Sequence, residues 1–370
     1  MKILIDCAPI VPALALGQTS GIGRTCRELV LALDAMRPTL PFEVILYTQN
    51  LKGVSARRLD TGFKSRHAYL RNTTAWNEWA RRLHVRELLT GYDLQHITHN
   101  YEIVRDPSRC IVTVHDAFFM RFDDAKFDYA RYRELYPPFI RRARHILTPS
   151  EYSRQDIIET MGVPEARITV TPWGLDHEAF FPVDDRQEVL RELTARFGLD
   201  APYFLSVSCD TGRKRTPQLI EAFCKVNPGA HLVLVWGNPP EEVRKMVAGN
   251  PKIHILSNLN NDDLRLLYNG ALASVNPTRY EGFGLPVLEA MACGVPVVTC
   301  RNSSIPEVGG NVPLYLDEPV ERSLPEMLRA LDRGEIVGLE ARTARGIARA
   351  AEFTWARTAG ATAAAYQSAF

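Results

Sequence analysis

The chain has 370 residues, 46% of them hydrophobic, and a formal net charge of +1 at pH 7. This length exceeds what one ordinary hydrophobic core holds, so two domains are expected. The near balance of 44 Lys and Arg against 43 Asp and Glu excludes the strongly basic footprint that bulk nucleic-acid binding needs, and we expect no nucleic-acid partner.

The N-terminal stretch MKILIDCAPIVPALALG superficially imitates a secretory signal peptide. Asp6 lies inside the would-be apolar run and Pro9 and Pro12 interrupt it, so a first strand, KILID, is the better prediction. No run approaches the roughly 18 apolar residues that a membrane span requires. The seven scattered cysteines lack metal-ligand spacing and are typical of reduced cytoplasmic thiols. We therefore expect a cytoplasmic protein that at most contacts the inner face of a membrane.

Short apolar runs alternate with amphipathic stretches along the whole chain. The runs predict strands at KILID (2–6), EVILY (43–47), LQHIT (94–98), CIVTVHD (110–116), FLSVS (204–208), HLVLVWG (231–237), KIHIL (252–256), ASVNP (273–277) and PVVTC (296–300). The amphipathic stretches predict helices at GRTCRELVLALDAM (23–36), SEYSRQDIIETMG (150–162), RTPQLIEAFCKV (215–226) and DDLRLLYNGA (262–271). Apolar strands that alternate with helices indicate parallel sheets covered on both faces, with ligands bound beyond the carboxyl ends of the strands.

A basic stretch lies between Lys52 and Arg86, with nine Lys or Arg and only two acids, Asp60 and Glu78. One interpretation is a solvated face. The other is a patch that meets an anionic acceptor or a membrane surface. The sequence leaves both interpretations open.

The stretch TRYEGFGLPVLEAMACGVPVVT (278–299) has the pattern of an anion site. Pro286 suits the first position of a helix, PVLEAMA, that stops near Gly294. The first amides of such a helix are unpaired and carry the positive end of its dipole, which favours a phosphate. Gly282 and Gly284 would let the backbone approach a ligand closely.

Two acids, Glu281 and Glu289, flank this helix start. A carboxylate beside a phosphate would be repelled, whereas it can accept strong hydrogen bonds from hydroxyl groups. A ligand with phosphates in its middle and hydroxylated rings at both ends, such as a nucleotide sugar, fits this arrangement. For Glu289 alone, simple stabilisation of the helix dipole is an equal alternative.

Several segments resemble the retaining glycosyltransferases of family 4, which have the GT-B fold. The stretch YEGFGLPVLEAMACGVPVV resembles the family's E-x7-E signature. Further resemblances follow in chain order: SGIGRTCREL (20–29), TVHDAFF (113–119), LTPSEYSRQDI (147–157), VTPWGLDHEAFFP (170–182), GRKRTPQLIEAF (212–223), SSIPEVGGNVPLYLD (303–317) and EFTWARTA (352–359). The fold implied is α/β, with two facing Rossmann-like domains and a deep interdomain cleft. We place the domains at 1–178 and 179–353, and expect a C-terminal helix at 354–370 to pack back on the first domain.

The resemblance also implies roles for residues of the second domain. Glu289 would hold the donor's ribose hydroxyls, and Glu281 would contact the transferred sugar near its 3-hydroxyl. The turn LSNLNNDDL (256–264), with Asn258 and Leu259, would bind the base through backbone groups. Further backbone groups would line the sugar and diphosphate: Phe283, Gly284, Leu285 and Pro286.

Arg213 and Lys214 would bind the diphosphate in this family. Two cations after the strand FLSVS would also stabilise the charge that grows on a leaving nucleoside diphosphate, without a metal ion. An exposed loop is the alternative for these residues, but their place at the carboxyl end of a strand favours the functional interpretation. From the first domain, Gly21 and Gly23 would cap the diphosphate, and His115 would orient the sugar's 6-hydroxyl or shuttle a proton.

The sequence therefore predicts a retaining glycosyltransferase that moves a hexose from a UDP- or GDP-sugar to a hydroxyl of a polysaccharide, lipopolysaccharide or lipid-linked glycan. No cofactor and no metal are expected, and 52–86 could contact a membrane. The main alternative is a nucleotide-sugar epimerase with the same fold. A nicotinamide-dependent dehydrogenase lacks its glycine fingerprint here, and a non-catalytic sugar-nucleotide-binding subunit is a third interpretation.

Overall fold

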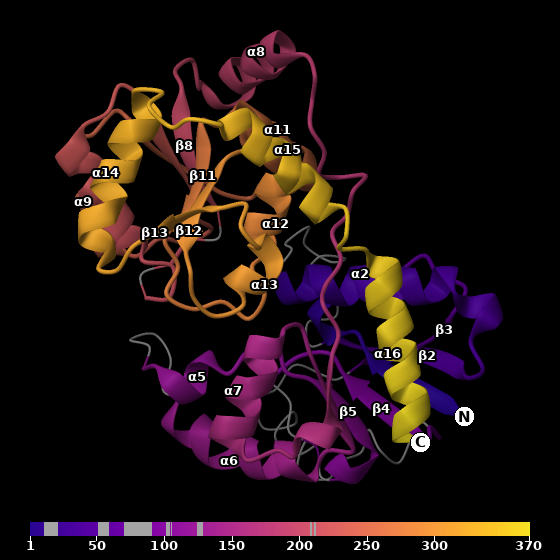
Figure 1. Ribbon diagram of the computed structural model, residues 1–370. Helices are drawn as coiled ribbons and strands as arrows, with labels where there is room; N and C mark the ends of the chain where they lie inside the picture. Colours follow the sequence, from indigo (N-terminus) through magenta and orange to yellow (C-terminus); the bar gives the residue numbers. More distant parts are fainter. Residues whose placement is uncertain are drawn as a thin grey trace. The chain divides into compact units, whose positions relative to one another are not determined.

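The computed structural model describes residues 1–10, 21–50, 59–69, 91–100, 104, 106–123, 129–207, 209–210 and 212–370. These residues form two compact units, which are Met1–Gly174 with Thr354–Phe370, and Leu175–Phe353. Each unit is a parallel sheet with helices on its faces (Figure 1). The expected boundary after residue 178 lies close to this division.

The first unit contains a parallel sheet with, among the described residues, seven strands in the order β3-β2-β1-β4-β5-β6-β7. They are β1 (Lys2–Asp6), β2 (Glu43–Asn50), β3 (Lys64–Tyr69), β4 (Leu94–Ile97), β5 (Cys110–Thr113), β6 (His145–Thr148) and β7 (Ile168–Val170). Strands β4, β5 and β6 are buried along their whole length, as expected for a sheet covered on both faces. The strand order changes direction between β1 and β4, the place where such sheets bind ligands.

Helices cover this sheet: α2 (Gly21–Ala35), α5 (Phe118–Arg121), α6 (Ala130–Arg142), α7 (Glu151–Met161) and α16 (Trp355–Ala369). Short 3-10 turns join them: η1 (Ala8–Ile10), η2 (Arg37–Thr39), η3 (Pro107–Arg109) and η4 (Glu165–Arg167). The C-terminal α16 packs against α2, far from it in sequence (Figure 1). Its Tyr366 is fully buried and meets the ring of Phe42 at a centroid distance of 5.6 Å, so the chain end belongs to the core of the first unit.

The second unit has, in its described residues, six parallel strands in the order β10-β9-β8-β11-β12-β13. They are β8 (Tyr203–Val207), β9 (His231–Val235), β10 (Ile253–Leu256), β11 (Ala273–Asn276), β12 (Val297–Cys300) and β13 (Leu314–Leu316). The covering helices are α8 (Arg186–Phe197), α9 (Thr216–Val226), α10 (Glu241–Val247), α11 (Asn261–Gly270), α12 (Leu285–Ala292), α13 (Ile305–Gly309), α14 (Val320–Asp332) and α15 (Leu339–Ala350). The direction changes between β8 and β11, so a ligand is expected beyond the carboxyl ends of these two strands.

Strands form at all the stretches predicted from apolar runs, and the structure adds four that the sequence did not predict, β3, β6, β7 and β13. Strand β5 ends at Thr113 rather than at Asp116, so His115 follows the strand instead of lying in it. The residues at which a strand begins and ends depend on its pairing with neighbouring strands, and a run of apolar residues does not indicate that pairing.

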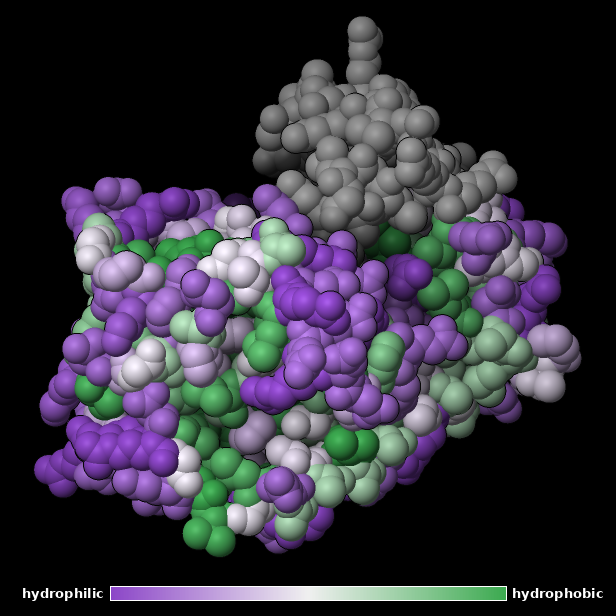
Figure 2. All heavy atoms as spheres, turned by 90° about the horizontal axis from the view of Figure 1, so that it is seen from above, coloured by the Kyte–Doolittle hydropathy of each residue, from purple (hydrophilic) through white to green (hydrophobic). Residues whose placement is uncertain are grey.

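The visible surface in Figure 2 mixes hydrophilic and hydrophobic side chains. Large hydrophobic residues that are exposed include Val337, between α14 and α15, and Phe370, after α16. In the part of the chain that the structure describes, no helix is both long enough and apolar enough to cross a bilayer. Most of the basic stretch 52–86 lies outside the described residues, which include only 59–69 of it.

Candidate functional site

Two loops of the second unit meet beyond the carboxyl ends of β8 and β11. The ammonium of Lys214, in the loop after β8, forms an ion pair with the carboxylate of Glu281, in the loop after β11. The two side chains are only 10% and 9% exposed. The backbones are also joined, because the Arg279 N–H donates to the Arg213 carbonyl at 2.7 Å and the Thr278 hydroxyl donates to the same oxygen at 3.2 Å. The sequence-predicted Arg213, Lys214 and Glu281 therefore lie in one place.

The charge of Glu281 depends on these cations. Burial, the largest effect, opposes ionisation of the carboxyl group, but the charges of Lys214 and then Arg213 outweigh it. The net result is a pKa of Glu281 below its ordinary value, so the group is an anion at neutral pH. An ionised carboxylate is an acceptor for hydroxyl groups, and it is held beside cations that can also attract a phosphate.

The N-terminus of α12 lies directly after this pair in the chain. Gly284 precedes the helix with φ of 108°, a backbone conformation that glycine adopts readily. A Cβ atom at this position would also lie 2.8 Å from the Ile305 side chain. The helix begins at Leu285. Pro286 therefore occupies its second position, whereas the sequence predicted the first. Pro286 has no N–H, and the Val287 and Leu288 N–H groups already donate to the Gly284 carbonyl at 3.0 and 3.2 Å, so the positive end of the helix dipole is what favours an anion here.

The side chain of Phe283 is part of the core of the second unit. It is 2% exposed and meets the ring of Phe353 edge-on at 5.8 Å. Its carbonyl accepts a hydrogen bond from the Ser304 hydroxyl at 2.8 Å. Any contact of Phe283 with a ligand would therefore be made by its backbone, as the family resemblance implies.

Glu289 lies on α12 and is 1% exposed. Its Oε2 atom accepts a hydrogen bond from the hydroxyl of Tyr268, on α11, at 3.0 Å. Tyr268 is fully buried, and the sequence analysis did not select it. The sequence offered only a general indication of this contact, namely that a tyrosine on the apolar face of a predicted helix needs a hydrogen-bond partner for its hydroxyl.

The turn expected to bind the base follows the edge strand β10. Asn258 is exposed there with φ of 57°, and Leu259 is half-buried beside it. Asn260 then caps α11 through a capping box with Asp263. Strand β9 separates β10 from β8, so these two strands lie about 10 Å apart, and the turn and the Lys214 loop follow them at the same edge of the sheet.

In the first unit, His115 follows β5 and is 6% exposed. Its Nε2 atom lies 2.9 Å from the Thr98 carbonyl, so Nε2 carries a hydrogen and donates it. Among the described residues, Nδ1 has no hydrogen-bond partner and remains an acceptor. Burial lowers the pKa of His115 to about 4, with a smaller opposing effect from the Thr98 carbonyl. The imidazole is therefore neutral at pH 7.

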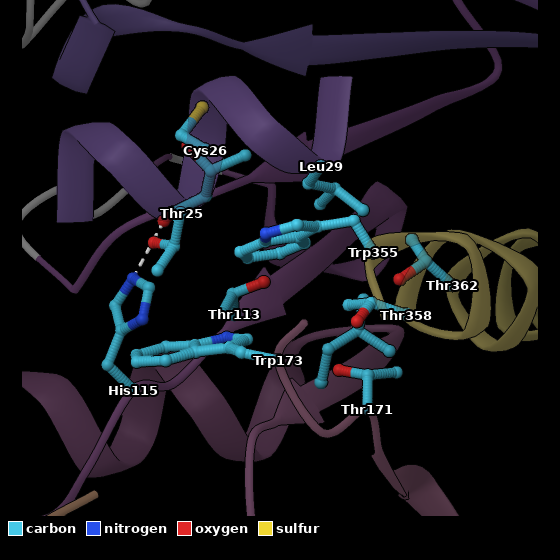
Figure 3. Close-up of a pocket in the computed structure, with 12 residues that line it drawn as sticks. Thr25, Cys26, Leu29, Thr113, His115, Thr171, Trp173, Trp355, Thr358 and Thr362 are labelled. Carbon is cyan, nitrogen blue, oxygen red and sulfur yellow. Dashed lines mark hydrogen bonds between the residues drawn. The ribbon is translucent and has the colours of Figure 1, made fainter. Parts of the chain in front are cut away.

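His115 borders a small cavity of the first unit (Figure 3). Its ring lies beside the indole of Trp173 at a centroid distance of 5.3 Å. The other lining residues are largely threonines: Thr25, Thr98, Thr113, Thr171, Thr358 and Thr362. The cavity volume of about 20 Å³ suits one water molecule and is too small for a sugar ring.

The helix predicted from Gly23 begins two residues earlier and includes both Gly21 and Gly23. Both lie in the first turn of α2, which begins at Gly21. Gly21 is exposed with open space where a Cβ would be, whereas Gly23 is buried.

Asp116 and two further polar residues lie at the same edge of the first sheet. The Asp116 carboxylate accepts the Phe118 N–H at 3.0 Å and fixes the loop before α5. Asp6 is the last residue of β1, and His99 follows β4. Both side chains are buried, and Oδ2 of Asp6 lies 3.8 Å from Nε2 of His99. The sequence analysis missed this pair, although polar residues at the carboxyl ends of adjacent strands are the general signal of such sites.

No group of three or more metal-ligating side chains occurs among the residues that the structure describes. The cations of the second-unit site are instead lysine and arginine side chains.

Family models match both halves of the chain. Residues 19–179 match the model described as Glycosyltransferase Family 4, and residues 202–329 match the model described as Glycosyl transferases group 1. Together these ranges include the His115 region, the Lys214 loop and both glutamates.

Curated relatives and solved structures resemble nearly the whole chain. The O-antigen chain mannosyltransferase B of Escherichia coli is 30% identical over 379 residues, which cover 96% of each chain. A GDP-mannose-dependent phosphatidylinositol monomannoside mannosyltransferase of Mycolicibacterium smegmatis is 32% identical over 173 residues, or 43% of this chain and 44% of that one. The structure of Anabaena HepE in complex with UDP and glucose has a TM-score of 0.76 at 16% identity and covers 100% of each chain. That structural likeness confirms the expected GT-B fold class.

Proposed function

Because the chain belongs to the group 1 glycosyltransferases of family 4, we propose that it moves a hexose from a nucleoside-diphosphate sugar to a hydroxyl of a growing polysaccharide, lipopolysaccharide or lipid-linked glycan. Mannose is the hexose proposed first, and GDP-mannose the donor, because the relatives described above are mannosyltransferases. The observation that carries the proposal is the Lys214–Glu281 pair at the start of α12, where cations, a helix N-terminus and a carboxylate meet.

The diphosphate of the donor would bind at the N-terminus of α12, with Lys214 and Arg213 beside it. As the bond between the anomeric carbon and the phosphate oxygen breaks, negative charge grows on the leaving nucleoside diphosphate. Two cations and the helix dipole would stabilise that charge without a metal ion. The ionised Glu281 would accept a hydrogen bond from a hydroxyl of the transferred sugar.

The remainder of the donor would extend along the same edge of the second sheet. Glu289, held by the Tyr268 hydroxyl, would accept hydrogen bonds from the ribose. The exposed turn at Asn258 and Leu259 would meet the base through its backbone. Backbone groups from Phe283 to Pro286 would line the sugar and the diphosphate, because the Phe283 side chain is occupied in the core.

The first unit would contribute the start of α2 and His115. Gly21 and Gly23, at the start of α2, would cap the diphosphate. A pKa of about 4 makes His115 a poor proton carrier at neutral pH. Of its two expected roles, orientation of the sugar's 6-hydroxyl is therefore the one we propose, and the proton-shuttle alternative is disfavoured.

We propose that transfer retains the anomeric configuration by a front-face route. A double displacement needs a carboxylate nucleophile, but Glu281 is paired with Lys214 and Glu289 is bound to Tyr268. In the front-face route the bond to the phosphate breaks, the acceptor oxygen bonds to the anomeric carbon on the same face, and the acceptor proton goes to the leaving phosphate. The comparisons give the epimerase alternative no support.

The test is binding followed by product analysis. Thermal shift with GDP-mannose, GDP, UDP-glucose and UDP should reveal stabilisation by the correct donor, since a ligand that binds only the folded state raises its stability. Transfer to methyl α-mannoside with and without EDTA, with the product anomer read by NMR, then tests mannosyl transfer, retention and metal independence. Absence of stabilisation by all four nucleotides would overturn the donor class, and an inverted product would overturn the mechanism.

We also propose that the protein is cytoplasmic and that the basic stretch 52–86 contacts an anionic acceptor or membrane surface. Sedimentation with anionic and neutral vesicles at two salt concentrations tests this: binding that ignores lipid charge and salt would identify a plain solvated face.

A further inference from the structure

A third loop of the second unit holds the backbone around Glu281. It follows β12 and consists of Asn302, Ser303 and Ser304. The Ser303 hydroxyl accepts the Glu281 N–H at 2.9 Å, and the Ser304 hydroxyl approaches the Glu281 carbonyl at 3.0 Å. Asn302 donates from its side-chain amide to the Thr278 carbonyl at 3.0 Å. Both main-chain polar groups of Glu281, its N–H and its carbonyl, are therefore bound by serine hydroxyls from a different loop.

Ser304 serves two carbonyls at once. It is fully buried, and its hydroxyl also lies 2.8 Å from the Phe283 carbonyl. Because a serine has a single hydroxyl hydrogen, this hydrogen lies between the two oxygens. The contact ties the Glu281 backbone to the residue just before Gly284, and so to the start of α12.

Ser303 adopts a backbone conformation that favours glycine. Its φ is 49°, in the left-handed region where a Cβ atom is unfavourable. A glycine would relieve that strain but would lose the hydroxyl that accepts the Glu281 N–H. Strain at a residue whose side chain contacts the site is an observation that points to a functional role for the side chain.

We propose that Ser303 and Ser304 are positioning residues that hold Glu281 against the sugar of the donor. The inference rests on the proposed contact between Glu281 and that sugar. Without donor, Lys214 restrains the carboxylate. A bound diphosphate competes for Lys214, so the position of Glu281 then depends on its backbone, which the two serine hydroxyls fix.

The decisive variant is Ser303→Gly, measured by calorimetric binding of GDP and of GDP-mannose. Glycine accepts the positive φ, so the melting temperature should stay the same or rise. The Kd for GDP should change less than twofold, because the phosphate contacts remain. The Kd for GDP-mannose should rise about fivefold, an effect of roughly the size of one lost hydrogen bond. A purely structural serine would not separate the two ligands in this way.

Ser304→Ala is the second variant and should have the same selective effect. Its matched control is Ser323→Ala, on α14. The Ser323 hydroxyl also donates to a backbone carbonyl, that of Asp317, at 2.6 Å. The control should leave the Kd for both ligands unchanged.

Combination with Glu281→Gln separates the possible failures. If Ser303 acts through Glu281, adding Ser303→Gly to Glu281→Gln should have little further effect on the Kd for GDP-mannose. If Glu281→Gln alone keeps the wild-type Kd and turnover, the proposed role of Glu281 is wrong. If Glu281→Gln weakens GDP-mannose binding but Ser303→Gly and Ser304→Ala do not, only the positioning role is overturned. Equal weakening of GDP and GDP-mannose binding in the serine variants also overturns it.

Discussion

Lys214 and Glu281 lie 67 positions apart in the sequence and form a buried ion pair beyond the carboxyl ends of β8 and β11. Breaking a buried pair by removing one partner is costly, because the other charge stays behind. A ligand that brings its own phosphate and hydroxyl groups can replace both partners. The pair therefore keeps a cation and an anion in place at the site proposed for the donor.

The first prediction concerns Glu281→Gln. Loss of the carboxylate should lower turnover at least about tenfold, the effect of about 1.4 kcal/mol of lost transition-state stabilisation. GDP itself should bind two- to fivefold more tightly, because Lys214 no longer interacts with a carboxylate and its full charge is available to the phosphate. Steady-state transfer and calorimetric titration with GDP measure the two effects.

The control for this variant is Glu318→Gln, which breaks the ion pair with Arg215 at 2.7 Å. Glu318 is 53% exposed, so its loss should change turnover and GDP affinity little. Near-wild-type turnover of Glu281→Gln would remove Glu281 from the sugar-binding site.

The second prediction concerns the pH dependence of Lys214→Met. In the wild type the folded-state pKa of Glu281 is lowered, so its contribution to stability is present above the unfolded pKa, about 4.3, and is lost as pH falls through the folded value. Without Lys214, burial is opposed mainly by Arg213, and the pKa of Glu281 should rise. The acid limb of the activity profile should then move to higher pH, which the pH dependence of kcat/KM measures.

A surface pair supplies the comparison. Arg333 contacts Glu335 at 3.7 Å, but the Arg333 side chain is 62% exposed. Arg333→Met should leave the activity profile unchanged and the stability nearly so. An acid limb that is identical in Lys214→Met and the wild type would show that Lys214 does not set the charge of Glu281.

Much of this site was predictable because it lies on short, local patterns. The turn and helix start from Glu281 to Glu289 are adjacent in sequence, and the apolar strand before Arg213 and Lys214 indicates the same edge of the sheet. The family match confirms the identification of these segments with glycosyltransferases. The roles of individual side chains stay predictions.

What the sequence did not supply are contacts between distant loops and conformations set by packing. Nothing local indicates that Ser303 and Ser304 bind the Glu281 peptide, or that Tyr268 holds Glu289. The helix predicted from Gly23 begins two residues earlier, at Gly21, because glycines suit both a loop and a helix start. These features depend on which elements pack together, and hydrophobic periodicity carries no information on that pairing.

The third prediction concerns Tyr268→Phe, which removes only the hydroxyl that donates to Glu289 at 3.0 Å. A buried carboxylate that loses a donor loses about 1–3 kcal/mol of hydrogen-bond stabilisation. If Glu289 binds the ribose, the KM for the donor should rise several-fold with a smaller change in kcat. Steady-state kinetics and calorimetric titration with GDP measure the effect.

The matched control is Tyr203→Phe, since the Tyr203 hydroxyl is also buried but donates to the Leu267 carbonyl at 2.6 Å. This variant should lose stability without a change in the KM for the donor. A donor KM that rises equally in both variants would show that the effect of Tyr268 is general destabilisation.

The fourth prediction concerns the attachment of the C-terminal helix at low pH. His96 lies on β4 and is held by two hydroxyl groups. Its Nδ1 atom is 2.6 Å from the Tyr366 hydroxyl, and its Nε2 atom is 2.7 Å from the Thr113 hydroxyl. Burial, followed by the nearby His115, lowers the pKa of His96 to about 3. In the unfolded chain a histidine has a pKa of about 6.5, so the unfolded state binds the proton first and stability falls as pH drops from 6.5 towards 3.

The free energy of unfolding should be about 2 kcal/mol lower at pH 5 than at pH 7.5 because of the buried His96. This is the free energy gained when a group of pKa 6.5 is protonated in the unfolded state alone. His96→Gln cannot titrate, so the pH dependence of the first unit should become flatter. Hydrogen exchange of the β4 and α16 amides at pH 5 and pH 7 follows this unit directly. His177→Gln, which alters an exposed histidine of the second unit, should leave that dependence unchanged. A slope in His96→Gln as steep as in the wild type would assign the acid sensitivity of the first unit to other groups.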